Sequence, residues 1–467
     1  MAEFLGQKLV KAKAITEEQL NKAIERQRYH GGRLGHNLVA LDFIKADELN
    51  TFLEAYPHAP KSIEQTGLDS SFIADLMLKH ILFMGDFKLA DLSEAIKLPV
   101  SIVDAVIETL RRDKFVEIKG ASEYARTTYN FTMTGQGKNR AGELLEICRY
   151  VGPTPVPLDE YRRMVEFQTI RNIVVDEGVV NKAFSHLILS ERLLKRLGPA
   201  VSCGRAIFIY GPAGNGKTTI AETIGKILPG TVYIPYSLIV GGQIITIFDP
   251  VSHIPCTNED KSQNGDNRWM CIKRPVIMTG GELTLQTLDL DFNTISKFYE
   301  ASLQLKANNG LFIVDDFGRQ RMEPQHLLNR WIVPLERCTD FMTLHTGMKF
   351  DVPFDQLVIF ATNLEPKNLV DEAFLRRIRY KIKIDHPTED EYEAIFKKIC
   401  TSNNIEFKEK VFDLLIKNYK KLGVKLNACH PRDLIEHIID DSHYYNHTPE
   451  LTPEAVVTAW ENYFVEM

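Results

Sequence analysis

The sequence lacks the features that mark secreted, membrane-spanning and strongly basic chains. Its 7 cysteines are scattered without C-x-x-C spacing, which favours reduced thiols over a disulfide framework. No apolar run approaches the roughly 18 residues of a membrane span, and no long apolar signal core is apparent. The net charge of -6 argues against nucleic-acid binding through bulk charge, although a local basic face stays compatible with it. We therefore expect a cytoplasmic protein.

What is present is typical of a globular chain with several domains. The sequence has 467 residues, of which 44% are hydrophobic and 25% charged, so about three domains are expected from length. Three alternating prolines make residues 151–157 a predicted stiff linker, and the polar stretch 57–70 predicts a second linker. The domain boundaries that we expect are 1–58, 68–150, 161–385 and 386–467.

A phosphate-binding loop lies near the middle of the chain. The apolar run 206–210 predicts a buried strand, and residues 211–218 follow with the full G-x-x-x-x-G-K-[ST] spacing before a helical stretch. Glycines let backbone N–H groups turn toward phosphates, and the helix N-terminus adds positive potential. We expect Lys217 to reach the β- and γ-phosphates and the Thr218 hydroxyl to hold Mg²⁺. The predicted nucleotide-binding residues here are Gly211, Pro212, Ala213, Gly214, Asn215, Gly216, Lys217, Thr218 and Thr219.

Two further apolar runs end in polar residues. The run 311–314 ends at Asp315 and Asp316, and the run 357–361 leads to Asn363. Because parallel strands present their carboxyl ends at one sheet edge, these side chains are expected beside the loop. We expect Asp315 to help hold Mg²⁺ and Asp316 to orient or deprotonate a water, while Asn363 bonds the γ-phosphate or that water. The alternative, without a catalytic role, is that Asp315 and Asp316 cap a helix and that Asn363 is a turn residue.

Arginines at two later positions complete the predicted site. Arg376, Arg377 and Arg379 cluster at a helix end, from which a guanidinium can stabilise charge on the γ-phosphate of a neighbouring subunit. We favour Arg377 and Arg379, and a solvated basic helix end is the alternative. Arg432 opens a helix in the C-terminal region and is expected to contact the nucleotide from there.

These five segments resemble, in order and spacing, the AAA+ ATPases over about residues 161–467. They correspond to that family's Walker A, Walker B, sensor 1, arginine finger and sensor 2. The resemblance implies ATP and Mg²⁺ as cofactors and an α/β P-loop fold followed by a helical lid. It also implies a ring, commonly of six subunits, with ATP sites between subunits. Most members have Asp-Glu where this chain has Asp315-Asp316, and the shorter carboxylate bears on hydrolysis more than on binding.

Residues 1–56 contain an internal repeat. The pattern Leu-Gly-x-x-Leu-Val occurs at 5–10 and again at 34–39. Apolar residues recur at the same offset, with Ile15, Leu20 and Ile24 matched by Ile44, Leu49 and Leu53. Each copy predicts a helix, a turn and a second helix with a cap at its start, Thr16 in one and Asp47 in the other. Two copies are expected to bury their apolar faces as a small all-α domain.

The repeat resembles the N-terminal module of type II secretion and type IV pilus assembly ATPases. Residues 33–35 match the opening of its second motif, and Gln27 matches the end of the first. Some of those modules bind cyclic di-GMP through two tandem copies. Phe4 stands where the first arginine is expected, and Lys13 and Asp42 replace the turn glycines. Docking to a protein partner is therefore the alternative to dinucleotide binding.

Residues 71–149 resemble a winged helix-turn-helix domain. The predicted order is helix, helix, helix, strand, strand, helix, at 72–84, 89–96, 101–112, 115–118, 129–133 and 136–148. One hypothesis is that the helix 101–112 contacts DNA in a major groove. That helix carries Asp104 and Glu108 beside Arg111 and Arg112, whereas a groove-reading helix usually exposes more basic and amide groups. Protein contact is the alternative that we favour.

A long insertion separates the predicted strands of the nucleotide-binding region, at 241–309. Its segment 297–300 holds Phe298 and Tyr299, which either grip a polypeptide at a ring's pore or pack in a core, and packing is favoured. Asp249, His253, Cys256 and Cys271 match no structural zinc spacing. After the Walker B residues, Arg319, Arg321 and Arg330 are candidates for interface contacts or structural ion pairs.

The sequence thus predicts an ATP-hydrolysing ATPase of the remodelling class. In this interpretation an oligomeric ring acts on protein partners in a secretion, pilus or signalling assembly, and the N-terminal domains select partners. One alternative is a regulator whose ATP state switches DNA binding by the winged helix. The other is a nucleotide-gated scaffold that hydrolyses ATP slowly.

Overall fold

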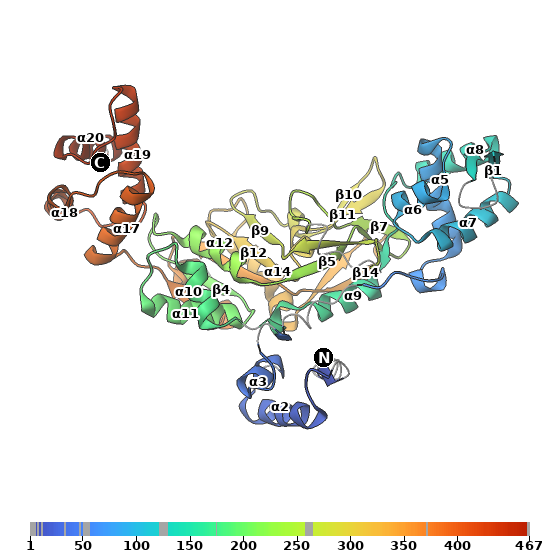
Figure 1. Cartoon of the computed structure of the whole chain (residues 1–467), viewed down its shortest axis with the longest axis horizontal. Coiled ribbons are helices and arrows are strands. Elements are labelled where there is room, and N and C mark those ends of the chain that lie inside the picture. Colours follow the sequence, from blue (N-terminus) through green and yellow to red (C-terminus); the bar gives the residue numbers. More distant parts are fainter. Residues whose placement is uncertain are drawn as a thin grey trace.

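The computed structural model describes residues 6, 9–10, 13–31, 34–45, 48–49, 57–120, 129–173, 175–256, 265–369 and 372–464. The molecule is elongated, with a central α/β domain between a C-terminal helical lid at one end and a middle domain at the other (Figure 1). The N-terminal module lies below the central domain in this view. Within the described ranges, every helix is too short or too polar to cross a bilayer.

A parallel five-stranded sheet forms the middle of the central domain. Its strand order is β16, β4, β15, β12, β9, and every neighbouring pair is parallel. The strands are β16 (Tyr380–Lys383), β4 (Ile207–Tyr210), β15 (Leu357–Thr362), β12 (Leu311–Val314) and β9 (Val276–Thr279). The three inner strands are almost wholly buried, which explains their near-continuous apolar sequences.

Helices cover both faces of this sheet. Alternate strand residues such as Ile209 and Ile313 pack with α10 (Glu177–Phe184), α11 (Glu191–Ser202) and α12 (Lys217–Ile227). The intervening residues, such as Phe208 and Phe312, pack with α14 (Pro324–Arg337) and α16 (Glu372–Arg377) on the other face. Two cores on one sheet make a three-layer α/β domain, which agrees with the α/β class predicted from the sequence.

The predicted insertion 241–309 is not a separate unit, because its residues 276–279 form β9 of the central sheet. Other parts of it contribute strands to a second sheet beside the first, together with residues 156–157 and 237–240. The order of this second sheet is β10, β11, β7, β6, β3, and two antiparallel ribbons, β5–β8 and β13–β14, accompany it. These strands are β3 (Val156–Pro157), β5 (Thr231–Pro235), β6 (Ser237–Val240), β7 (Gln243–Thr246), β8 (Trp269–Lys273), β10 (Asp291–Asn293), β11 (Phe298–Glu300), β13 (Thr339–Thr343) and β14 (Lys349–Pro353). They share a core with α9 (Leu158–Phe167).

Several candidate residues of the insertion have structural roles. Tyr299 is 1% exposed within β11, so packing is confirmed for this aromatic residue. His253 is buried against the carbonyl of Lys306, whose ammonium forms ion pairs with Asp249 and Glu300. Arg330 likewise forms ion pairs with Asp340 and Asp289, so the structural role that was one of its two predicted roles is present in the structure.

The N-terminal module has the repeated core that the sequence predicts. Its helices include α2 (Glu17–His30) and α3 (Leu34–Ala40), and both copies contribute matched buried residues. The matched pairs are Leu9 with Leu38, Ile15 with Ile44, and Leu20 with Leu49. Thr16 caps α2 with a reciprocal capping box, as expected. Phe4, Leu5, Arg33, Asp47 and Leu53 lie outside the described residues.

Two non-glycine residues take up the module's left-handed turns. Lys13 has a φ of 59° and Asp42 a φ of 53°, at the two positions where the resembled module has glycine. These conformations are accessible to other residues at a modest energetic cost. The turn geometry of the repeat is therefore retained although its glycines are replaced.

The middle domain has the predicted order of elements. They are α5 (Ser70–Met84), α6 (Leu89–Ile96), α7 (Val100–Arg112), β1 (Val116–Gly120), β2 (Asn130–Met133) and α8 (Gly135–Ile147). An isolated bridge between Phe87 and Phe131 adds a third antiparallel partner to the two strands. On α7, Glu108 and Arg111 form an ion pair at 2.7 Å, so that this arginine is already partnered. The chain between the two strands, at 121–128, is outside the described residues.

The lid consists of four helices around one apolar core. They are α17 (Glu389–Ser402), α18 (Glu409–Leu422), α19 (His430–Tyr444) and α20 (Pro453–Tyr463). Figure 1 shows them projecting from the end of the central domain that carries α10 to α12.

The two predicted linkers are instead docked segments. In 57–70, Thr66 is buried and the carbonyl of Pro57 accepts a hydrogen bond from the Asp266 backbone. In 151–157, Thr154 is buried, and the last two residues form strand β3 against β6. Proline and polar composition did not reveal this, because the hydrogen bonds are backbone contacts to distant segments.

A buried arginine joins the docked segment to the central domain. Arg268 is 2% exposed, and its guanidinium bonds Asp266 at 2.8 Å, Glu160 at 3.3 Å and the carbonyl of Thr66 at 2.9 Å. Burial raises the pKa of Glu160, and the arginine opposes that rise. The cluster therefore connects three segments that are far apart in sequence.

We expect Arg268→Ala to destabilise the protein by about 3 kcal/mol, because it leaves the buried Asp266 carboxylate without its partner. Urea unfolding checks this value, and limited proteolysis should show faster cleavage near residues 57–70. Arg163→Ala, an exposed arginine on α9, serves as the matched control. A change of less than about 0.5 kcal/mol for Arg268→Ala would contradict the role of the cluster.

Candidate functional site

The loop between β4 and α12 has the curled backbone that its glycines predict. Gly211, Gly214 and Gly216 have φ values of 140°, 73° and 77°. A Cβ on Gly211 would lie 2.0 Å from the carbonyl oxygen of Ile384, and one on Gly214 would lie 2.5 Å from the Cys429 sulfur. Glycine is therefore required at the first two positions both by the backbone angle and by close neighbours.

Lys217 lies inside this loop. It is 7% exposed, and its Nζ donates hydrogen bonds to the carbonyls of Gly211 at 2.9 Å and Pro212 at 2.8 Å. Burial lowers the pKa of Lys217, whereas Asp315 and Asp316 act to raise it. A buried ammonium on the first residue of α12, where the helix N-terminus adds positive potential, is suited to an anionic ligand.

Thr218 and Asp315 meet as predicted. The Thr218 hydroxyl donates a hydrogen bond of 2.8 Å to Oδ2 of Asp315, which directly follows β12. A hydroxyl and a carboxylate at this distance, next to a phosphate-binding loop, are an oxygen donor set that suits Mg²⁺. These two residues fit the ion that the sequence predicts.

Asp316 has an unusual backbone. Its φ is 46°, in the left-handed region, and its Oδ1 accepts a hydrogen bond from Asn363 Nδ2 at 3.3 Å. Aspartate and asparagine tolerate this region better than longer side chains, so the backbone gives a reason for Asp rather than Glu here. The Asp316 carboxylate and the Asn363 amide, which follows β15, line the same cavity.

These side chains line one cavity of about 460 Å³, which is within the range for small-ligand sites. Lys217, Thr218, Asp315, Asp316 and Asn363 all contribute to it. Its remaining wall includes apolar residues that the sequence did not single out, namely Leu187, Ile188, Leu189, Ile395 and Ile399. The last two are spaced four apart on α17, a signal that is indistinguishable in sequence from ordinary core packing.

The predicted arginines divide into two groups. Arg432 lines the cavity from α19 and forms ion pairs with Asp433 and Glu436. Arg377 pairs with Glu336 at 2.5 Å, and Arg379 lies near Cys203, and neither lines this cavity. Their predicted action on a neighbouring subunit stays a prediction.

The lid is hydrogen-bonded directly to the phosphate loop. The Asn215 Oδ1 accepts a bond from the Ala428 backbone at 2.9 Å, and the Gly214 carbonyl accepts one from Cys429 at 2.8 Å. The Asn215 amide also lies 3.4 Å from Oδ1 of Asn427. A displacement of the loop is therefore expected to move the start of α19.

A hydrogen-bonded chain continues from this contact into the lid core. Asn427 Nδ2 donates to His430 Nε2 at 3.2 Å, which places the imidazole proton on Nδ1. That Nδ1–H donates to the Tyr419 hydroxyl at 2.9 Å, and Tyr419 lies 2.9 Å from the Tyr392 hydroxyl. Burial lowers the pKa of His430 to about 4, with His386 adding to this and Asp433 opposing it.

Comparison with solved structures finds loose similarity to several proteins. The Thermotoga maritima RuvB Holliday junction branch migration motor matches at 14% identity, covering 64% of this chain and 74% of that chain, with a TM-score of 0.33. NtrX from Brucella abortus matches at 12% identity, covering 61% of this chain and 57% of that one, with a TM-score of 0.38. Domain III of the Thermotoga maritima replication initiation protein DnaA matches at 15% identity, covering 61% and 98%, with a TM-score of 0.33.

These sequence identities and TM-scores are too low to transfer a residue's role or an activity to this chain. The interpretation of the site therefore rests on this chain's own geometry. The family model of a domain of unknown function (DUF8689) matches residues 388–462, which hold α17 to α20. No curated protein matches the sequence.

The low pKa of His430 leads to a pH prediction. Between pH 6.5 and about 4 the unfolded chain binds a proton at this histidine that the folded chain does not, so stability falls as the pH falls through this window. We expect this residue to account for about 2 kcal/mol of lost stability between pH 7 and pH 5. His430→Gln should remove that part of the pH dependence, which unfolding curves at both pH values will measure. His443→Gln, exposed on the same helix, is the control, and parallel pH curves for wild type and His430→Gln would refute the prediction.

Proposed function

We propose that this chain is an ATP-hydrolysing P-loop ATPase of the AAA+ class. The observation that carries the proposal is the convergence of Lys217, Thr218, Asp315, Asp316 and Asn363 on one cavity at the carboxyl edge of the parallel sheet. The strand order supports the proposal further. The strand that leads into the phosphate loop, β4, is an inner strand between β16 and β15, so the loop leaves the sheet next to the end of β15. An apolar wall opposite these polar groups suits a purine base.

The proposed chemistry is attack of water on the γ-phosphate of ATP. Lys217 and the loop's N–H groups bind the phosphates. Thr218 and Asp315 would hold Mg²⁺, which would supply positive charge to neutralise the phosphate oxygens. Asp316 accepts a proton from the water or orients it, and Asn363 helps to position it. Positioning and electrostatic stabilisation supply most of the acceleration.

The proposal includes an oligomer, because among the residues that the structure describes one arginine lines the cavity. Arg432 lines it, but is already paired with two carboxylates. A further guanidinium, Arg377 or Arg379, would come from a neighbouring subunit and stabilise the transferring phosphoryl group. In this proposal the ring remodels protein partners, which the N-terminal module and the middle domain select.

Lys217→Ala should lower nucleotide turnover by at least about a hundredfold, because it removes the buried charge that faces the phosphates. Steady-state phosphate release from ATP measures this. Lys226→Ala, an exposed lysine on the same helix, is the matched control and should retain turnover. Undiminished turnover in Lys217→Ala would contradict the assignment of this loop as the site of ATP hydrolysis.

Asp316→Asn should keep ATP binding but lose about a hundredfold or more in hydrolysis, because the amide cannot accept the proton. Asparagine suits the left-handed backbone at this position as well as aspartate does, so the fold should be unchanged. Equilibrium ATP binding and single-turnover hydrolysis separate the two effects. Asp413→Asn, at an exposed position in α18, is the control. Equal hydrolysis by Asp316→Asn and wild type would exclude this carboxylate as the base.

A further inference from the structure

A second cavity, of about 470 Å³, lies at the opposite edge of the central sheet. Arg205, which lines it, precedes the first residue of β4, and Asp355 precedes β15, so both stand at the amino ends of strands whose carboxyl ends form the nucleotide site. The two cavities share no lining residue. The proposed ATPase activity therefore does not explain this second cavity.

The walls of the second cavity come from two domains. The central domain provides α9, the 3₁₀ turn η3 (Ile170–Asn172), the end of α14 and the ribbon β13–β14, while the N-terminal module provides Gln27 and Leu34. The module reaches this place through packing of α3 on η3. Ligand sites occur preferentially at such domain junctions.

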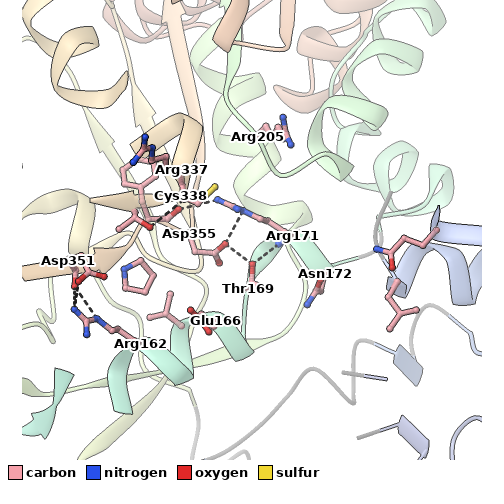
Figure 2. Close-up of a pocket in the computed structure, with 16 residues that line it drawn as sticks. Arg162, Glu166, Thr169, Arg171, Asn172, Arg205, Arg337, Cys338, Asp351 and Asp355 are labelled. Atoms are coloured by element: carbon pink, nitrogen blue, oxygen red, sulfur yellow. Dashed lines mark hydrogen bonds and ion pairs between the residues drawn. The ribbon is translucent and has the colours of Figure 1, made fainter. Parts of the chain in front are cut away.

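Arginine is the most frequent residue type in the lining, and the four guanidiniums differ in their partners. Arg162 forms an ion pair with Asp351 at 2.6 Å, and Arg171 pairs with Asp355 at 3.4 Å, as Figure 2 shows. Arg205 and Arg337 have no side-chain hydrogen bond or ion pair within the part of the chain that the structure describes. Two of the four positive charges are thus uncompensated.

The remaining polar groups are arranged unevenly around the cavity. In Figure 2, Arg205 and Arg337 lie on the upper side of the cavity in this view, Arg171 lies below them, and Glu166 lies on the lower side. Asn172 and Thr339 add an amide and a hydroxyl to the lining. Guanidinium groups with neighbouring neutral donors are the usual means of holding phosphate or carboxylate oxygens.

We propose that this cavity binds a small oxyanion ligand, bearing phosphate or carboxylate groups, through Arg205 and Arg337 at the junction of the N-terminal module and the central domain. The ligand compensates the two unpaired guanidiniums. The ligand is a small molecule, because the cavity volume of about 470 Å³ is within the range of small-molecule sites. Since Gln27 and Leu34 line the same cavity, the bound ligand also contacts the module.

Titration calorimetry on the full chain tests the proposal with inorganic pyrophosphate and with citrate as probes. The Lys217→Ala background removes the principal phosphate ligand of the nucleotide cavity, so the outcome does not depend on the proposed ATPase activity. We expect at least one probe to bind, and the probe that binds distinguishes a phosphate ligand from a carboxylate ligand. Adding Arg205→Ala and Arg337→Ala together should weaken that binding at least tenfold.

Arg192→Ala in the same background is the matched control, because this arginine is exposed on α11 and lines neither cavity, and its binding should be unchanged. The mutated arginines are also exposed, so equal unfolding temperatures are expected for all variants. Failure of both probes to bind at millimolar concentration would overturn the proposal. Binding that persists without Arg205 and Arg337 would overturn it equally.

Discussion

The parallel register of the central sheet is the constraint on which the rest of the site depends. Val314 pairs with Phe360, and Thr362 pairs with Tyr210, so the chain leaves three strands at one edge within a few residues of each other. The phosphate loop, the two aspartates and Asn363 begin at those exits. Because the side-chain period of a strand is two residues, a shift of one residue would exchange the two buried faces and displace every polar group.

The site also depends on the lid, which is not a passive cover. Backbone and side-chain hydrogen bonds join Gly214 and Asn215 to the start of α19, and a chain through Asn427 and His430 carries that contact into the lid core. The Gly214 backbone approaches Cys429 so closely that no side chain fits between them. Any ligand that alters the loop is therefore expected to change the orientation of the lid. In the proposed ATPase, this contact would link the nucleotide state to domain movement.

The sequence predicted the local parts of this structure well. The phosphate loop, the capped helix at Thr16 and the order of elements in the middle domain are set by short-range patterns, which can be read without tertiary contacts. The docking of the two predicted linkers, 57–70 and 151–157, was missed because they bond to segments that are distant in the sequence, such as Asp266 and β6. The apolar wall of the nucleotide cavity was missed because its residues have the same pattern as core residues. The left-handed backbone of Asp316 has no sequence signal apart from the departure from Asp-Glu itself.

The most direct test of the account is the rate of phosphate release from ATP by the purified full chain, measured with and without Mg²⁺ over a range of protein concentrations. The account predicts saturable release that requires Mg²⁺, with a rate per subunit that rises with protein concentration as neighbouring subunits complete each other's sites. ATP binding without any release, at every protein concentration and with Mg²⁺ present, would contradict it and leave a nucleotide-gated scaffold instead.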